Sequence, residues 1–479
     1  MEAPNMELLM EMHAQNRSKL RQAMASSGSA SGVVLLQGGE EQLRYCTDHV
    51  DLFRQESFFA YLFGVRDPGF FGAIDLISGI AALFIPRLDP EYAVWLGDIH
   101  PPSYIKERYQ VDAAYYVDEM VQILQGFDPN NVLYLLYGLN TDSKRTCKPA
   151  SFKGIEQFKV DLDTLHPVFV ECRVHKSKLE LDLLRYVNDV SSAAHVAVMK
   201  AARVGMKEYH LESTFLHYVY MQGGCRYAAY TCICATGENS SVLHYGHAAA
   251  PNDRTLQHGD MALLDMGAEF HCYCSDITCS FPVTGKFTDD QRVVYGAVLE
   301  AQKAVISKMR PGVAWIDMHR LAEKKILGVL KHAGFLQGDE EEMMRSHLGA
   351  VFMPHGLGHF LGLDTHDPGG YPKGLERVNS PGLRSLRTIR DLEEGMVITV
   401  EPGCYFIEAI LVPALENPET ARFFNTQAFQ RLRGTGGVRL EDDVVVTADG
   451  CENLTKCPRE MKDVEEVMAG GSWNISQGR

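Results

Sequence analysis

Two aspartates stand close together in an otherwise apolar stretch of the sequence. Asp265 and Asp276 lie eleven positions apart within residues 263–278. On one continuous strand this odd separation points the side chains to opposite faces, whereas a hairpin that turns near Phe270 places the two positions opposite each other on one face. Two carboxylates in apolar surroundings repel each other unless a cation lies between them. The hairpin therefore predicts a cation site, although aspartates beside a turn also fit simple exposure to solvent.

Three histidines follow in a glycine-rich stretch, at His355, His359 and His366. The first two have the spacing of a helical zinc site, but Gly356 and Gly358 lie between them and no glutamate follows His355, so we predict a strand or loop. Glycines let backbone and ligand approach closely, which would let one histidine reach a metal while the other two contact a substrate. Hydrogen-bonded structural histidines are the alternative.

Two glutamates end or precede apolar runs, Glu401 after residues 396–400 and Glu441 before residues 444–446. A buried carboxylate needs a cationic partner because its desolvation is costly. Arg439 is a candidate partner for one of them, and an ion pair or exposure at a strand end fits either glutamate alone.

These five side chains together form a hard, oxygen-rich ligand set. Four carboxylates and one histidine suit divalent manganese, cobalt or zinc in a two-metal site, and do not suit copper or iron–sulfur clusters. Such a site activates a bridging water. No rival chemistry is as well supplied, since the sequence has no G-x-S-x-G motif, no P-loop and no dinucleotide-binding fingerprint.

The elements that must position these residues fall into two parts. With 479 residues, the chain is expected to form two domains, 1–170 and 171–479, the first of mixed α/β type. Runs rich in β-branched and aromatic residues predict strands, and three- and four-residue spacing of apolar residues predicts helices. The predicted strands are 33–36, 58–65, 72–77, 81–85, 92–97 and 132–137; the predicted helices are 103–109, 117–125, two within 179–224, 289–309 and 316–333.

Composition narrows the class of protein. The formal net charge of -16 and the lack of a basic run argue against nucleic acid as a partner. The first twelve residues carry glutamates and no basic residue, which does not fit a secretory signal, and the apolar stretch 70–88 is broken by Asp75 and Pro86, so no membrane span is expected. We therefore expect a cytoplasmic protein whose twelve cysteines are free thiols.

Taken together, these motifs resemble those of the prolidases, the Xaa-Pro dipeptidases of the pita-bread metallopeptidase superfamily. The likeness runs from residues 53–59 to the segment around Glu441, and includes residues 244–248, the aspartate hairpin, the His359 loop and residues 400–403 in the family's order. It implies an α/β (α+β) fold in which a mixed α/β domain, used for dimerisation and substrate access, precedes a pita-bread catalytic domain. It also implies hydrolysis of dipeptides that end in proline.

Carried over to this sequence, the resemblance implies two divalent metal ions, expected to be Mn2+. Asp265 and Asp276 would hold one ion, Asp276, His359 and Glu401 would reach the second, and Glu441 would bridge the pair. The implied general base is Glu401. The other implied site residues are His244 and His366, which stabilise the tetrahedral intermediate or hold the substrate, His355 in the proline pocket, and Arg387, which clamps the substrate carboxylate.

The resemblance further implies a homodimer, in which Trp95 matches an aromatic residue that reaches the partner's site; a buried core position is the alternative for it. Cys404 and Thr435 stand where animal members carry larger apolar residues, which leaves the shape of the pocket open. Two other functions share the same motifs: an Xaa-Pro aminopeptidase that acts on longer peptides, and a binding protein of this fold without catalysis.

Overall fold

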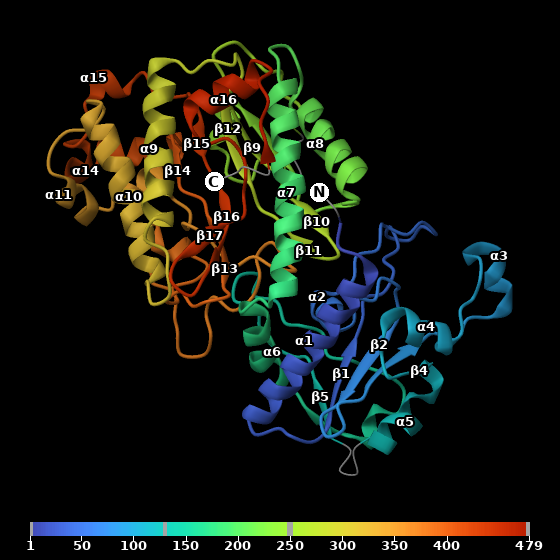
Figure 1. The fold of residues 1–479 in the computed structure, drawn as a ribbon. Coiled ribbons are helices and arrows are strands. Elements are labelled where there is room, and N and C mark those ends of the chain that lie inside the picture. Colours follow the sequence, from blue (N-terminus) through green and yellow to red (C-terminus); the bar gives the residue numbers. More distant parts are fainter. Residues whose placement is uncertain (1–2, 128–131, 247–251, 476–479) are drawn as a thin grey trace. The chain divides into compact units, whose positions relative to one another are not determined.

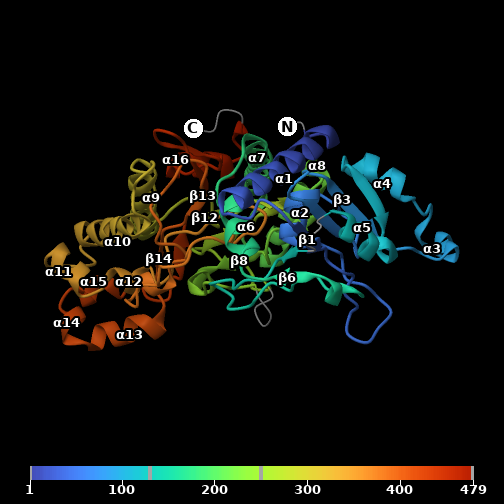
Figure 2. The same ribbon diagram turned by 90° about the horizontal axis from the view of Figure 1, so that it is seen from below.

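The computed structural model describes residues 3–127, 132–246 and 252–475, and the chain forms two compact units. The first unit consists mainly of Pro4–Val174 and the second mainly of Leu181–Arg479. Both units appear in the ribbon views of Figures 1 and 2. No helix in the described ranges is long and apolar enough to cross a membrane.

A six-stranded mixed sheet forms the centre of the first unit, with the strand order β4-β3-β2-β1-β5-β6. Strand β1 runs antiparallel to β2 and parallel to β5, and its residues Val33 and Leu35 belong to the buried core that β2, β3 and α5 complete. Four of the predicted strands, 33–36, 72–77, 81–85 and 132–137, are confirmed. The strands are β1 Val33–Gln37, β2 Phe71–Asp75, β3 Ala81–Ile85, β4 Ala113–Tyr116, β5 Val132–Leu135 and β6 Lys159–Asp161.

Two predicted strands of this unit are helical, so those predictions were wrong. Residues 58–65 fall on helix α2 (Ser57–Phe63), where the Glu56 side chain accepts a hydrogen bond from the Phe59 N–H and Gly64 ends the helix at φ 62°. All seven residues of α2 are buried, which hides the helical period. Residues 92–97 fall on a 3₁₀ turn and α3. The helices are α1 Met6–Ser26, α2, α3 Ala93–Leu96, α4 Pro102–Tyr109, α5 Met120–Phe127 and α6 Leu165–Val174, of which α4 and α5 were predicted.

The second unit holds four small antiparallel sheets with the orders β12-β9-β8, β13-β16-β17, β14-β15 and β11-β10-β7. In Figures 1 and 2 the strands β12, β13 and β14 lie between α9 on one side and α7 on the other, whereas β10 and β11 lie beyond α7 in Figure 1. The strands are β7 Tyr227–Ala228, β8 Ile233–Thr236, β9 Met261–Asp265, β10 Ala268–Phe270, β11 Tyr273–Cys274, β12 Thr278–Pro282, β13 Val397–Val400, β14 Gly403–Tyr405, β15 Gly437–Arg439, β16 Asp442–Val446 and β17 Cys451–Asn453.

The predicted long helices of this unit are confirmed. Helix α9 begins at a capping box, in which Thr288 accepts from the Gln291 N–H and the Gln291 side chain accepts from the Thr288 N–H. The helices are α7 Lys178–Ala201, α8 Glu208–Gly223, α9 Asp289–Ile306, α10 Trp315–His332, α11 Glu340–Arg345, α12 Gly349–Phe352, α13 Glu408–Glu416, α14 Pro418–Ala421, α15 Thr426–Phe429 and α16 Met461–Met468. All twelve cysteines are free thiols, as predicted.

Candidate metal centre

The hairpin that carries the two aspartates turns one residue later than predicted. Phe270 pairs with Tyr273, and the two turn residues, His271 and Cys272, have φ angles of 49° and 68°, as a tight two-residue hairpin turn requires. Asp265 is therefore opposite Thr278 rather than Asp276, and that prediction was wrong by two positions. An even shift leaves a side chain on the same face, so both aspartates still point into one cavity.

A buried cluster of ligand-type atoms lies where the two sheets that contain β9 and β16 meet. Asp276, His359 and Glu441 each offer an atom within 4.8 Å of the others. His359 Nε2 lies 3.3 Å from Asp276 Oδ2 and 3.6 Å from Glu401 Oε1. Its Nδ1 donates to the Phe360 carbonyl at 3.0 Å, which directs the Nε2 lone pair toward the carboxylates.

Three side chains hold the carboxylates in place. Arg439 donates to Asp265 Oδ2 at 2.6 Å, and the Tyr230 hydroxyl donates to Asp265 Oδ1 at 2.6 Å. The Thr278 hydroxyl donates to Glu441 Oε2 at 2.6 Å. The sequence suggested that Arg439 pairs with one of the two glutamates. In the structure it forms its ion pair with Asp265 instead. Sequence reasoning missed Tyr230 and Thr278, because neither position carries a local signal.

The electrostatics of the cluster call for additional positive charge. Burial, with the repulsion of neighbouring carboxylates, raises the pKa of Glu401 to about 7 although His359 and Arg439 oppose the shift. Burial and the same repulsion raise the pKa of Glu441 well above its usual range. The pKa of Asp265 is raised by burial, whereas hydrogen bonding to His359 lowers that of Asp276 against the effect of burial. Buried oxygens that resist ionisation without a counter-charge fit a site for hard divalent cations.

A cavity of about 270 Å³ opens over this cluster, and it brings the predicted site residues of the second unit together. Its lining includes all five candidate ligands and, beside them, His244, His355, His366, Ser385 and Arg387. His244 and His366 are exposed to the solvent at the mouth of the cavity. Loss of part of its hydration, together with His359 and Arg387 nearby, lowers the pKa of His366.

The hydrogen bonds of His355 define its protonation. Its Nδ1 lies 2.8 Å from the Gly356 carbonyl, to which it donates, and its Nε2 lies 2.9 Å from the Tyr405 hydroxyl. Arg439 Nη1 donates to the Tyr405 oxygen at 2.9 Å, so the tyrosine proton points to Nε2. Burial lowers the pKa of His355 to about 3. The ring therefore faces the cavity uncharged, with both nitrogens engaged.

Other predicted positions lie outside this cavity. Trp95 belongs to α3 of the first unit and is 83% exposed, which rules out the buried alternative. Cys404 is buried in β14, while Thr435 is exposed. Residues 247 and 248 of the 244–248 motif lie outside the described residues.

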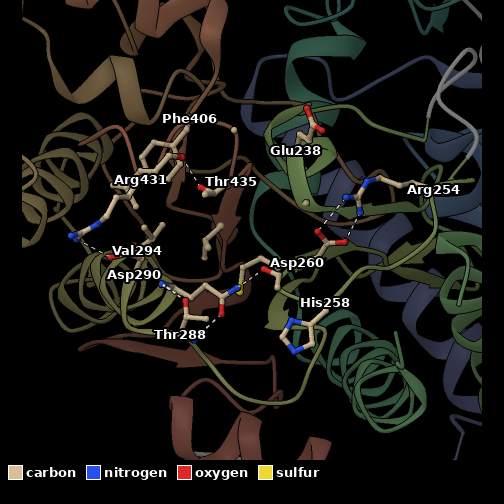
Figure 3. A pocket seen from close by; sticks show the side chains of 18 residues that line it. Glu238, Arg254, His258, Asp260, Thr288, Asp290, Val294, Phe406, Arg431 and Thr435 are labelled. Carbon is tan, nitrogen blue, oxygen red and sulfur yellow. Dashed lines mark hydrogen bonds and ion pairs between the residues drawn. The ribbon is translucent and has the colours of Figure 1, made fainter. Parts of the chain in front are cut away.

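A second cavity of about 360 Å³ lies beside the start of α9, and Figure 3 shows its lining. Four of its charged groups pair within the wall: Arg254 with Asp260, and Arg431 with Asp290 at 3.0 Å. This cavity holds no cluster of like charges comparable to that of the first one.

Comparison with known proteins agrees with this geometry. Residues 182–448 match metallopeptidase family M24, and residues 13–134 match the N-terminal domain of aminopeptidase P. The chain is 56% identical to the Xaa-Pro dipeptidase of Homo sapiens over 461 residues, and these residues are 96% of this chain and 93% of that protein. The chain belongs to metallopeptidase family M24. It is a hydrolase, and the resemblance seen in the sequence is confirmed.

More distant relatives match nearly the whole chain. A probable Xaa-Pro aminopeptidase of Verticillium alfalfae is 36% identical over 441 residues, which are 92% of this chain and 93% of that protein. The structure of zinc-substituted Escherichia coli aminopeptidase P in complex with product superimposes with a TM-score of 0.77 at 30% identity, over 96% of this chain and 99% of that one. The predicted α/β fold with a pita-bread catalytic part is thereby confirmed.

Proposed function

We propose that this chain is an Xaa-Pro dipeptidase, which hydrolyses dipeptides with C-terminal proline and releases free proline. The observation that carries the proposal is one small cavity in which the hard set of candidate ligands lies together with an arginine, Arg387. The volume of about 270 Å³ is slightly below the range of about 300–1,000 Å³ that is typical of ligand cavities, which suits a small substrate. The relatives at 55–56% identity, which are Xaa-Pro dipeptidases, support the same assignment.

We assign the metal sites to the five clustered side chains. Asp265 and Asp276 would hold one divalent ion, Asp276, His359 and Glu401 the second, and Glu441 would bridge them. Bound ions of this kind supply Lewis-acid activation of the attacking water. Manganese is the expected metal, because oxygen-rich sets with one imidazole suit it.

Glu401 is the proposed general base. Its carboxylate lies in the cavity wall, 3.6 Å from His359 Nε2, where it can take a proton from a water molecule that attacks the substrate. The bond before proline is a tertiary amide without an N–H, so the leaving ring nitrogen must receive a proton. Glu401 can return the proton that it removed from water.

The remaining cavity residues are assigned to the substrate. Arg387 would bind the free carboxylate of proline through charge-assisted hydrogen bonds. His244 and His366, at the mouth, would hold the dipeptide and support the tetrahedral intermediate. His355 would line the proline pocket with an uncharged ring, because its nitrogens are engaged by Gly356 and Tyr405.

The wider assignments follow the same proposal. We assign residues 1–170 to dimerisation and substrate access and residues 171–479 to catalysis, in a cytoplasmic homodimer. The exposed Trp95, on α3, is the candidate that would reach the partner's site.

An Xaa-Pro aminopeptidase is the competing function, because the aminopeptidase P structures share the fold at a TM-score of 0.77. A third residue on the substrate would displace the carboxylate from Arg387. A binding protein without catalysis is less well supported, since all five candidate ligands are present in one cavity.

Proline release from Gly-Pro by the metal-stripped protein, measured after addition of Mn2+, tests the proposal. We expect metal-dependent release from Gly-Pro, none from Glu401→Gln, and unchanged release from Glu341→Gln, a matched control whose glutamate is exposed and pairs with Lys324. Cleavage of Gly-Pro-Gly as fast as Gly-Pro would identify an aminopeptidase. Absence of activity with any divalent metal would favour the binding protein.

A further inference from the structure

The proposed metal ligands come from two sheets that are not joined by a strand ladder. Asp265 ends β9, and Asp276 precedes β12 of the same sheet, whereas Glu401 and Glu441 flank β13 and β16 of another. Within the described residues, the backbone hydrogen bond from the Glu441 N–H to the Thr278 carbonyl, at 3.1 Å, joins the two sheets beside the cluster. Side-chain hydrogen bonds supplement it, from the Asp276 N–H to Asp443 Oδ2 at 2.9 Å and from Arg439 Nε to the Thr278 hydroxyl oxygen at 3.1 Å.

Arg459 is one side chain that bonds to the backbone of both sheets beside the cluster. Its Nη1 donates to the Thr278 carbonyl at 2.9 Å, and its Nη2 donates to the Glu441 carbonyl at 2.6 Å. The guanidinium therefore joins Thr278, the first residue of β12, to the backbone of a proposed ligand that precedes β16 of the other sheet. A planar fork of donors at fixed spacing sets the distance between two carbonyls in a way that a flexible ammonium cannot.

The guanidinium is itself held in its plane. Asp442 accepts from Nε at 2.9 Å and from Nη2 at 2.6 Å, and the Arg459 side chain is only 12% exposed. Asp442 is fixed in turn by Asn453, whose amide donates to Oδ2 at 2.7 Å. The Tyr295 hydroxyl of α9 donates to the Arg459 carbonyl at 2.8 Å, so the backbone of this residue is anchored as well.

The Arg459 guanidinium acts on Glu441 in two ways. It fixes the Glu441 carbonyl directly, and it fixes Thr278, whose hydroxyl donates to Glu441 Oε2 at 2.6 Å. A displacement of Arg459 would therefore move both the backbone and the carboxylate of Glu441. Partners of this kind around metal ligands change metal affinity or activity by about 10–100-fold when they are removed.

We propose that Arg459 is a positioning residue of the metal centre, which joins the two sheets so that Glu441 meets Asp276 and His359 at the spacing that divalent cations require. The proposal rests on the metal assignment made above. It predicts that Arg459 affects metal affinity and turnover, while substrate affinity, which depends on Arg387 and the histidines at the cavity mouth, stays unchanged.

The test compares wild type with Arg459→Lys, which keeps the charge and loses the fork. We expect affinity for Mn2+ about 10–100-fold weaker, a changed visible absorption spectrum of the Co2+-loaded protein, lower kcat at saturating Mn2+, and a KM for Gly-Pro within about twofold of wild type. Arg185→Met is the matched control, since Arg185 forms a similar two-pronged pair with Glu452, 2.9 and 2.7 Å, on a half-exposed surface. It should leave the Mn2+ affinity and the Co2+ spectrum unchanged.

Asp442→Asn keeps the guanidinium but removes the charge that holds it, and it guards against a lysine variant that does not fold. We expect the same changes in smaller size, with the circular dichroism of the metal-free protein preserved. The proposal would be refuted if the folded Arg459→Lys variant binds Mn2+ with wild-type affinity and gives the wild-type Co2+ spectrum. If the lysine variant does not fold, the same result for the folded Asp442→Asn variant would refute it. Wild type that neither binds Mn2+ nor cleaves Gly-Pro would instead refute the function on which it rests.

Discussion

We expect the affinity of this chain for divalent metal to rise steeply between pH 6 and pH 8, because protons compete for the ligands. In the metal-free protein the pKa of Glu401 is about 7, raised chiefly by burial. A metal ion binds the ionised carboxylate only, so a pKa raised into this window weakens metal binding below it. Glu441, whose pKa is also raised by burial, and His359, whose pKa is raised by Asp276 and Glu401, act in the same direction.

The size of the effect follows from Glu401 alone. With a pKa of about 7, roughly nine in ten molecules carry the proton at pH 6 and roughly one in ten at pH 8, so affinity increases about tenfold, or about 1.4 kcal/mol. Asp276 adds nothing in this range because its pKa is lowered by its hydrogen bond to His359 and it stays ionised. His355, with a pKa of about 3, stays neutral throughout.

Titration calorimetry with Mn2+ at pH 6, 7 and 8, in two buffers with different ionisation enthalpies, measures both affinity and released protons. We expect about one proton or more released at pH 6 and fewer at pH 8. The Glu401→Gln variant should release correspondingly fewer protons at pH 6. An affinity that is constant from pH 6 to pH 8, without proton release, would show that the carboxylates are already ionised without metal and would refute the electrostatic reasoning.

Three further predictions concern single side chains. Arg387→Met should raise KM for Gly-Pro by about 10–100-fold, the worth of a charged hydrogen bond, and leave KM for the amide of Gly-Pro unchanged, as steady-state kinetics would measure. Arg439→Met leaves its aspartate partner buried without a counter-charge and should lower the unfolding free energy of the metal-free protein by about 3–5 kcal/mol in urea, with partial recovery in Mn2+. Gly358→Ala, whose Cβ would lie 1.9 Å from the Thr399 carbonyl oxygen, should lose metal binding and activity, whereas Gly126→Ala, with open space around it, should not.

The sequence predicted correctly the elements whose residues show a clear hydrophobic period or a composition typical of strands. Helices α9 and α10 carry one apolar face each, and β1 and β3 are short runs of β-branched and apolar residues. Helix α2 has no polar face, so only its ends identify it: Glu56 as the N-cap and Gly64 in the left-handed conformation. End signals therefore deserve more weight than composition where an aromatic run is short and wholly buried.

The candidate ligands were predictable because a carboxylate at the end of a buried strand needs a reason to be there. The groups that hold them were not. Tyr230 bonds to Asp265, 35 positions away in the sequence, and Arg459 bonds to the backbone of Glu441, 18 positions away. Nothing near either residue in the sequence indicates its partner. Tertiary hydrogen bonds of this kind are visible only once the chain is folded.

The hairpin error shows which part of a strand argument is robust. The turn at His271 and Cys272, and not at Phe270, shifts the partner of Asp265 from Asp276 to Thr278, yet both aspartates keep the same face. The shifted register has a chemical use, because it places the Thr278 hydroxyl where it can donate to Glu441 of the other sheet. A threonine directly opposite the first ligand thus connects the two halves of the proposed centre, and the carboxylate that it holds is the one whose backbone Arg459 clamps.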